Sequence, residues 1–235
     1  MNAATLPVDS GLPASATRVV DVHDDAGHLV TRMSFMGDVQ HGEMVRYGAD
    51  GTVLLNAMFA LGVLSGPSRA FDASGAPLIE SHYVDGKLHG LVTTWQKGVL
   101  ASRQQYALGA LNGESVSYAP GGLVTSRVKY VKGLPDGEAL FMHDGVVVRR
   151  VRYRLGVLEG ETLDYAEDGA LSQLSPYRAG LLDGTVRRYG PDGQVMQERR
   201  YVQGKPQGAW RAISASGDAP AAPRLSQRLE RWVRG

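Results

Sequence analysis

The sequence predicts an all-β protein: an elongated, twisted, single-layer antiparallel sheet of about eight tandem β-hairpin repeats, followed by a short C-terminal helix. Three observations favour this fold. An aromatic residue recurs every 23 or 24 residues, two glycines follow it at fixed distances, and a third glycine-containing turn precedes the next aromatic. Self-similarity at such a period is typical of repeat arrays in which each unit packs against its neighbours.

Each repeat is defined by four positions, the first of which is called the opening aromatic. The opening aromatics are Phe35, Phe59, Tyr83, Tyr106, Tyr130, Tyr153, Tyr177 and Tyr201. The first glycine follows three residues later, as Gly62, Gly86, Gly109, Gly133, Gly156, Gly180 and Gly204, with Asp38 in its place in the first repeat. The second glycine follows seven residues after the aromatic, as Gly42, Gly66, Gly90, Gly113, Gly137, Gly160, Gly184 and Gly208. A second aromatic follows after twelve, as Tyr47, Phe71, Trp95, Tyr118, Tyr165 and Tyr189, while the fifth repeat has Met142 there.

Two strands are expected in each repeat. Turns such as Asp144-Gly145 and Asp168-Gly169 predict tight hairpins, because aspartate and glycine tolerate left-handed backbone conformations. One strand should run from the second glycine to the second aromatic, as in residues 160–165, and the other from the turn into the next opening aromatic, as in residues 146–153. Short turns pair such strands antiparallel, so about sixteen strands are expected.

The pattern of an aromatic, two residues, glycine, three residues and glycine, as in Tyr83 to Gly90 and Tyr201 to Gly208, resembles the MORN repeat. It is most similar to the bacterial variant of the YwqK type, and the resemblance covers residues 27 to 213. It implies an extended, twisted array of hairpins and a role as an antitoxin, immunity factor or scaffold. The family supplies no catalytic residues to carry over, and Asp38, Met142 and Ile213 depart from its pattern.

Composition and charge limit the remaining classes. The 25 basic and 24 acidic residues give a net charge of +1, which does not favour broad attraction to nucleic acid. The absence of cysteine removes disulfides and thiolate chemistry and fits a cytoplasmic protein. The N-terminus has no secretory signal pattern, and no apolar run is long enough for a membrane span.

Charged residues sorted by repeat position predict the candidate binding residues. Basic residues recur one and three positions before the opening aromatic, and residues two apart on a strand share a face. This basic stripe comprises Arg103, Arg127, Lys129, Arg150, Arg152 and Arg200. The segment between the two glycines, expected to form a hairpin tip, adds His89, Asp136, Glu159 and Asp183. The stripe would either pair with glutamates across strands or present a charged surface to an acidic partner.

Other chemistry finds little support in the sequence. The six histidines do not cluster as metal ligands, and each Asp-Gly turn offers one carboxylate where calcium needs six to eight oxygens. No hydrolase, dinucleotide or nucleotide-triphosphate motif is present. The aromatic ladder suits core packing, with base stacking as the alternative. We therefore expect neither enzymatic activity nor a cofactor or metal.

The ends of the chain are expected to differ from the array, which should span residues 18–213. Residues 1–17 predict a flexible lead, 214–223 a linker, and 224–235 an amphipathic helix that could cap the last hairpin, contact a partner or touch a membrane surface. The function expected is that of an antitoxin or immunity protein that binds a cognate toxin or secreted effector and occludes it. The alternative is a scaffold that binds anionic lipid through the basic stripe and the C-terminal helix.

Overall fold

The computed structural model describes residues 17–213. The chain divides into two compact units, Met1–Gly98 and Val99–Gly235, which are described separately. The expected N-terminal lead, linker and C-terminal helix lie outside the described residues, apart from residue 17 itself. The described part is all-β, and no helix within it could cross a membrane.

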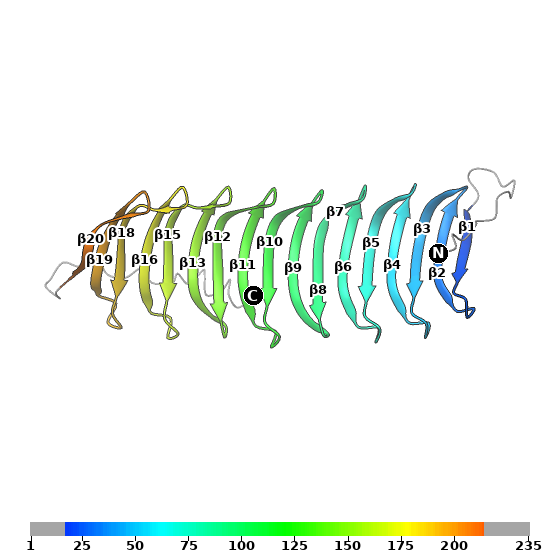
Figure 1. Ribbon diagram of the computed structural model, residues 1–235, viewed down its shortest axis with the longest axis horizontal. Coiled ribbons are helices and arrows are strands. Elements are labelled where there is room, and N and C mark those ends of the chain that lie inside the picture. Colours follow the sequence, from blue (N-terminus) through cyan, green and yellow to red (C-terminus); the bar gives the residue numbers. More distant parts are fainter. Residues whose placement is uncertain (1–16, 214–235) are drawn as a thin grey trace. The chain divides into compact units, whose positions relative to one another are not determined.

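The first unit contains eight strands that pair antiparallel in chain order, with β7 and β8 both paired with β6 (Figure 1). They are β1 (Thr17–His23), β2 (Leu29–Met36), β3 (Val39–Tyr47), β4 (Val53–Ala60), β5 (Val63–Phe71), β6 (Pro77–Val84), β7 (Lys87–Leu88) and β8 (Gly90–Gln96). The pairings build one open sheet of consecutive hairpins.

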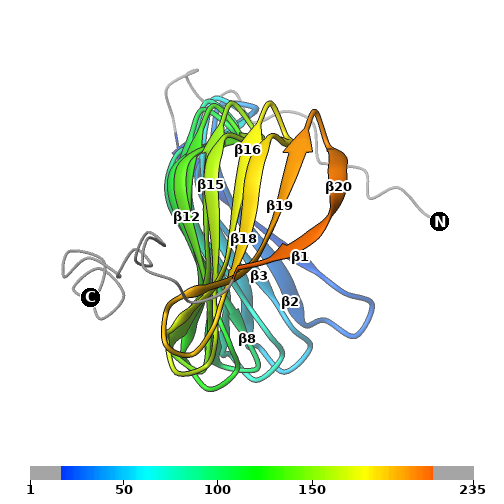
Figure 2. The same ribbon diagram turned by 90° about the vertical axis from the view of Figure 1, so that its left-hand side faces the viewer.

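The second unit contains twelve strands with the same connectivity. They are β9 (Val99–Ala107), β10 (Ala110–Tyr118), β11 (Val124–Val131), β12 (Leu134–His143), β13 (Val146–Arg154), β14 (Val157–Leu158), β15 (Gly160–Tyr165), β16 (Leu171–Arg178), β17 (Leu181–Leu182), β18 (Gly184–Tyr189), β19 (Val195–Val202) and β20 (Lys205–Ala212). Figure 2 shows these strands bowed and following one another as a single layer.

The strand predictions are confirmed at the positions named in the sequence. β15 spans Gly160–Tyr165, and β13 begins at Val146 and ends one residue beyond the opening aromatic Tyr153. The strand number exceeds the expected sixteen largely because β7, β14 and β17 are two-residue pieces separated from β8, β15 and β18 near the second glycine.

The segment between the two glycines is not the tip of the hairpin, which corrects the expectation. The turn has only two residues, and the strand resumes directly after the first glycine, so that Ala110 already pairs with Ala107. Farther along, the register shifts: Tyr130 pairs with Pro135 but Val128 pairs with Ala139. Three residues of β12 therefore face one of β11, and this bulge carries the residues that were expected at the tip.

Both residues of this two-residue turn adopt positive φ. In the sixth repeat Leu155 has a φ of 48° and Gly156 a φ of 86°, the combination that a type I′ turn requires. The first repeat solves the same problem differently. Gly37 takes the first turn position with a φ of 59°, and a type II′ turn needs positive φ only there, which explains why Asp38 is tolerated in place of the first glycine.

The second glycine of each repeat lies directly opposite the opening aromatic of the next repeat. Within the two units the register shows six such pairs: Gly42 with Phe59, Gly66 with Tyr83, Gly113 with Tyr130, Gly137 with Tyr153, Gly160 with Tyr177 and Gly184 with Tyr201. These glycines have φ values between 95° and 132° in the pairs from Gly42 to Gly184. A Cβ at each of these glycines would lie within 4 Å of the residue just before the opening aromatic of its own repeat, as Gly42 would of Ser34 and Gly184 of Pro176, so the position favours a residue without a side chain.

The sheet has two faces of different composition, which we name by their residues in the second unit. The aromatic face carries the opening tyrosines and a midline of small side chains that includes Ala139, Thr162 and Ser175. The arginine face carries Arg127 and Arg150 together with Leu140 and Leu163. Side chains directly opposite one another in a ladder share a face, so each face follows from the register.

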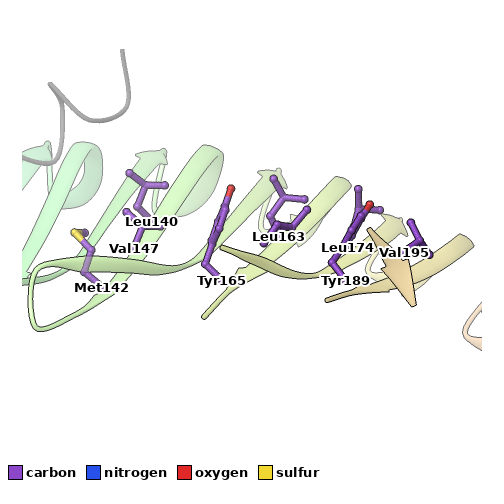
Figure 3. Close-up of a cluster of buried hydrophobic side chains, with 9 residues drawn as sticks. Leu140, Met142, Val147, Leu163, Tyr165, Leu174, Tyr189 and Val195 are labelled. Atoms are coloured by element: carbon purple, nitrogen blue, oxygen red, sulfur yellow. The ribbon is translucent and has the colours of Figure 1, made fainter. Parts of the chain in front are cut away.

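The largest fully buried side chains of the second unit lie on the arginine face. Leu140 is 0% exposed and Leu163 1% exposed, and Tyr165, Leu174 and Tyr189 belong to the same cluster. In Figure 3 these side chains project to one side of the ribbon, with each tyrosine ring standing next to leucine side chains. Tyr165 and Tyr189, the second aromatics of two repeats, are thus core residues, as the regular recurrence of aromatics predicted. The prediction is wrong for the opening tyrosines of the second unit, which are partly exposed and lie outside this cluster.

We expect Gly184→Ala to destabilise the second unit more than Gly208→Ala does. An alanine Cβ at position 184 would lie 2.7 Å from Cγ of Pro176, and Gly184 has a φ of 129°. Position 208 has a similarly left-handed φ of 87° but no atom within 4 Å of the new Cβ. Chemical denaturation should show losses in the free energy of unfolding of about 3 and about 1 kcal/mol respectively. Equal losses would contradict the crowding of position 184 by Pro176.

Tyr165→Phe is expected to stabilise the protein and to flatten its response to alkaline pH. The Tyr165 hydroxyl is buried and has no hydrogen-bond partner among the described residues. Burial raises its pKa above the ordinary value of about 10, with a smaller opposing effect from Arg150. The unfolded chain therefore loses this proton first as the pH rises above about 10, and the free energy of unfolding falls there. Removing the hydroxyl should add about 1 kcal/mol to the free energy of unfolding at pH 7. Chemical denaturation at pH 7 and at a pH above about 10 would measure both effects.

Candidate partner-binding surface

The structure places all six residues of the predicted basic stripe on the arginine face of the second unit. Arg103 lies on β9, Arg127 and Lys129 on β11, Arg150 and Arg152 on β13, and Arg200 on β19. Three of these arginines lie in one row along the middle of the face, which we call its midline. In this row Arg103 lies opposite Val116, Val116 opposite Arg127, Arg127 opposite Leu140 and Leu140 opposite Arg150. Arginines and apolar residues alternate along this row.

Two of the six cations are paired with glutamates of the neighbouring strand. Arg127 lies 3.4 Å from a carboxylate oxygen of Glu114, and Arg150 lies 3.1 Å from one of Glu138. The side chain of Arg127 is 11% exposed and that of Arg150 29% exposed. The apolar neighbours on either side bury the stems of these arginines, so the two ion pairs belong to the packing of the sheet.

The other four cations of the stripe, Arg103, Lys129, Arg152 and Arg200, are exposed and form no ion pair within residues 17–213. Lys129 lies directly opposite Glu114 and Arg152 directly opposite Glu138, but these glutamates bond diagonally to the midline arginines instead. The stripe therefore has a paired part and a part whose charges face solvent.

The predicted acidic residues of the bulge contact the backbone of the next repeat. Oδ2 of Asp136 accepts a hydrogen bond of 3.2 Å from the N–H of Leu155, and Oε2 of Glu159 accepts one of 2.8 Å from the N–H of Ala179. Both donors occupy the first, positive-φ position of a two-residue turn. These side chains join successive turns along the sheet edge.

The other two predicted residues differ in their contacts. Asp183 lies beside Arg178, with 3.7 Å between the charged groups. His89 lies in the first unit between β7 and β8, and its backbone N–H donates to the carbonyl oxygen of His82. Of the residues predicted for binding, the structure thus brings only those of the basic stripe together on one face.

Neutral side chains at the same position of the bulge make the same contact with the next turn, which sequence analysis did not predict. Nδ1 of His41 accepts from the N–H of Leu61, and Oδ1 of Asn112 accepts from the N–H of Lys132, at 3.3 and 3.2 Å. The signal in the sequence for these contacts was a side chain that can accept a hydrogen bond, six residues after the opening aromatic. The first glycine adds a backbone bond in the same place, for example from Gly180 to the carbonyl of Leu158 at 2.9 Å.

A groove on the aromatic face of the second unit is the other feature that sequence analysis did not predict. It has a volume of about 510 Å³. Tyr153, Leu158 and Tyr177 line one side, and Val151, Thr162 and Ser175 lie on the midline. The signal in the sequence was local: Ala139 and Thr162 lie nine positions after an opening aromatic, and Val151 and Ser175 lie two positions before one.

The opposite side of this groove carries polar side chains together with Phe141 and Val148. Nε of Arg149 lies 2.5 Å from Oδ1 of Asp164, and this hydrogen bond raises the pKa of Arg149 further above its ordinary value. Nε2 of Gln173 donates to Oγ of Ser175 at 3.0 Å. Oε1 of Gln173 accepts from Nε of Arg188, whose guanidinium lies 4.1 Å from the centre of the Trp210 ring. Within residues 17–213, no three histidine, aspartate or glutamate side chains are grouped for a metal ion.

Glu159→Ala is expected to weaken the turn of the following repeat. The substitution removes the acceptor of the Ala179 N–H, so the free energy of unfolding should fall by about 1 kcal/mol. The amide hydrogen of Ala179 should exchange at least five-fold faster, as measured by NMR. The matched control is Glu161→Ala, two residues farther along and exposed, which should change neither quantity. Unchanged exchange at Ala179 in Glu159→Ala would contradict the joining role.

Comparison with known proteins adds the following. No curated protein matches the chain. Two solved structures, titled "Crystal Structure of TcdB2-TccC3" and "Crystal Structure of TcdB2-TccC3-Cdc42", each share 14% identity with it over 86% and 80% of its length, at TM-scores of 0.22 and 0.21. The matched region makes up 14% of the chain in each of them.

Residues 182–203 match the family model described as a MORN repeat variant. They run from β17 through β18 and β19 and include the second glycine Gly184 and the opening aromatic Tyr201. The match thus covers one glycine–aromatic pair of the array. The chain contains a MORN repeat variant at residues 182–203, which supports the MORN-repeat resemblance of its sequence.

Proposed function

We propose that the chain is a non-catalytic binding protein that holds an acidic protein partner against the arginine face of its second unit. The partner is proposed to be a cognate toxin or secreted effector. The bound chain would neutralise it by covering its active surface. The toxin assignment follows from the resemblance of the repeats to YwqK-type proteins. The observation that carries the binding proposal is the set of exposed cations Arg103, Lys129, Arg152 and Arg200, which no acidic side chain of the described chain pairs with.

The arrangement of this surface suits recognition of an acidic partner. The paired arginines and their glutamates form a fixed inner row, and the exposed cations can approach carboxylates without first breaking an ion pair. Charges of this kind accelerate association by steering and set the register of the complex. Leu140 and Leu163 lie too deep to supply contact area, so charge and the surrounding stems would carry the contact.

Copurification with the product of the neighbouring gene tests this proposal. The full chain should form a stable complex with that product and abolish its toxicity when the two are coexpressed. The charge reversal of Lys129 and Arg152 to glutamate should lower the association rate constant at least ten-fold and reduce its dependence on salt, measured by surface plasmon resonance. Lys132→Glu, an exposed cation within a two-residue turn, is the matched control and should leave the rate nearly unchanged.

Two outcomes would contradict the proposal. One is the absence of a complex with every neighbouring gene product. The other is sedimentation of the chain with phosphatidylserine vesicles that is lost at high salt and on deletion of residues 224–235, which would assign the cations to anionic lipid.

A further inference from the structure

The aromatic face of the second unit presents five opening tyrosines in a line. Tyr106, Tyr130, Tyr153, Tyr177 and Tyr201 lie on β9, β11, β13, β16 and β19, and each ring is partly exposed. One full-length strand separates each tyrosine strand from the next. Since neighbouring strands are about 4.8 Å apart, the tyrosines recur about every 9.6 Å across the strands.

This spacing matches one regular backbone conformation of a peptide laid across the strands. A polyproline II helix has three residues per turn and rises about 3.1 Å per residue, so it repeats every ~9.3 Å. An extended β-strand repeats every ~6.7 Å and an α-helix every ~5.4 Å, and neither keeps step with the tyrosines. A polyproline II segment could place one side chain of each turn against a successive tyrosine ring.

The chemistry of the groove fits the same ligand. Tyrosine rings offer flat apolar surfaces for proline rings, and aromatic-lined grooves are how folded domains bind proline-rich segments. A polyproline II backbone leaves its carbonyl oxygens without internal partners. Donors for them line the groove at Tyr153, Tyr177, Arg149 and Gln173. The midline side chains Thr162 and Ser175 are small, and the groove lies above them.

We propose that the aromatic face of the second unit binds a proline-rich protein segment in the polyproline II conformation, running across the strands with one turn for each tyrosine. The groove of about 510 Å³ between Tyr153 and Tyr177 is the centre of this site. The site lies on the face opposite to the exposed cations and does not depend on the toxin proposal.

The test uses the full chain and fluorescently labelled oligoprolines of six, nine and twelve residues, with anisotropy as the readout. Affinity should rise at least three-fold with each three-residue step, because each added turn reaches another tyrosine. A twelve-residue glycine–serine peptide should not bind. Equal affinities for the six- and twelve-residue oligoprolines, or no binding of either at millimolar concentration, would overturn the proposal.

Variants locate the site. Tyr153→Ala and Tyr177→Ala should each weaken binding of the twelve-residue oligoproline at least ten-fold, with the circular dichroism spectrum checking that the sheet is kept. The double variant Tyr153→Phe and Tyr177→Phe keeps both rings in place and should lose about three-fold through the missing hydroxyls. Lys129→Ala, on the arginine face, is the control and should bind as the unchanged chain does. Unchanged affinity in the tyrosine variants would overturn the assignment to this face, whatever the result with the neighbouring gene product.

Discussion

The whole array depends on one steric relation: a residue without a side chain lies opposite the opening aromatic of the next repeat, and a Cβ there would crowd the residue just before the opening aromatic of its own repeat. Gly160 opposite Tyr177 and Gly184 opposite Tyr201 show the relation in successive hairpins. The same glycine adopts a left-handed φ, which allows the chain to bulge just before it. The bulge in turn directs the Glu159 carboxylate at the turn of the next repeat. The bulge and the turn contact are therefore consequences of a single choice of residue.

The two faces of the sheet also differ in composition and packing. Small residues and partly exposed tyrosines occupy the aromatic face, which leaves it hollowed between Tyr153 and Tyr177. Leucines and second aromatics fill the arginine face, and Arg127 and Arg150 are built into that packing through their ion pairs. A single-layer sheet has to cover its apolar residues with its own side chains, and long arginine stems contribute to that cover. The exposed cations at the same face are left available for a partner.

Much of the fold could be predicted because its determinants repeat. The positions of glycine and aromatic residues gave the strand Gly160–Tyr165 residue for residue. The two-residue turn was not predicted, because Leu155 at its first position is a residue type that normally avoids positive φ. The bonds from Asp136 and Glu159 were missed because the sequence does not show which backbone amide passes a carboxylate. The cation row followed from strand alternation, but its ion pairs depend on a diagonal geometry that spacing alone does not reveal.

When each two-residue strand is counted with the strand that follows it, the strands within each unit pair only with the strands before and after them in the chain. Every contact between hairpins is therefore made across a short stretch of sequence, so each hairpin can form on its neighbour without closing a long loop. A gene segment of 23 or 24 codons could be duplicated or lost while the hairpins on both sides kept their registers. The number of tyrosines in the line, and with it the length of ligand that the face can measure, is open to change by recombination without redesign of the sheet.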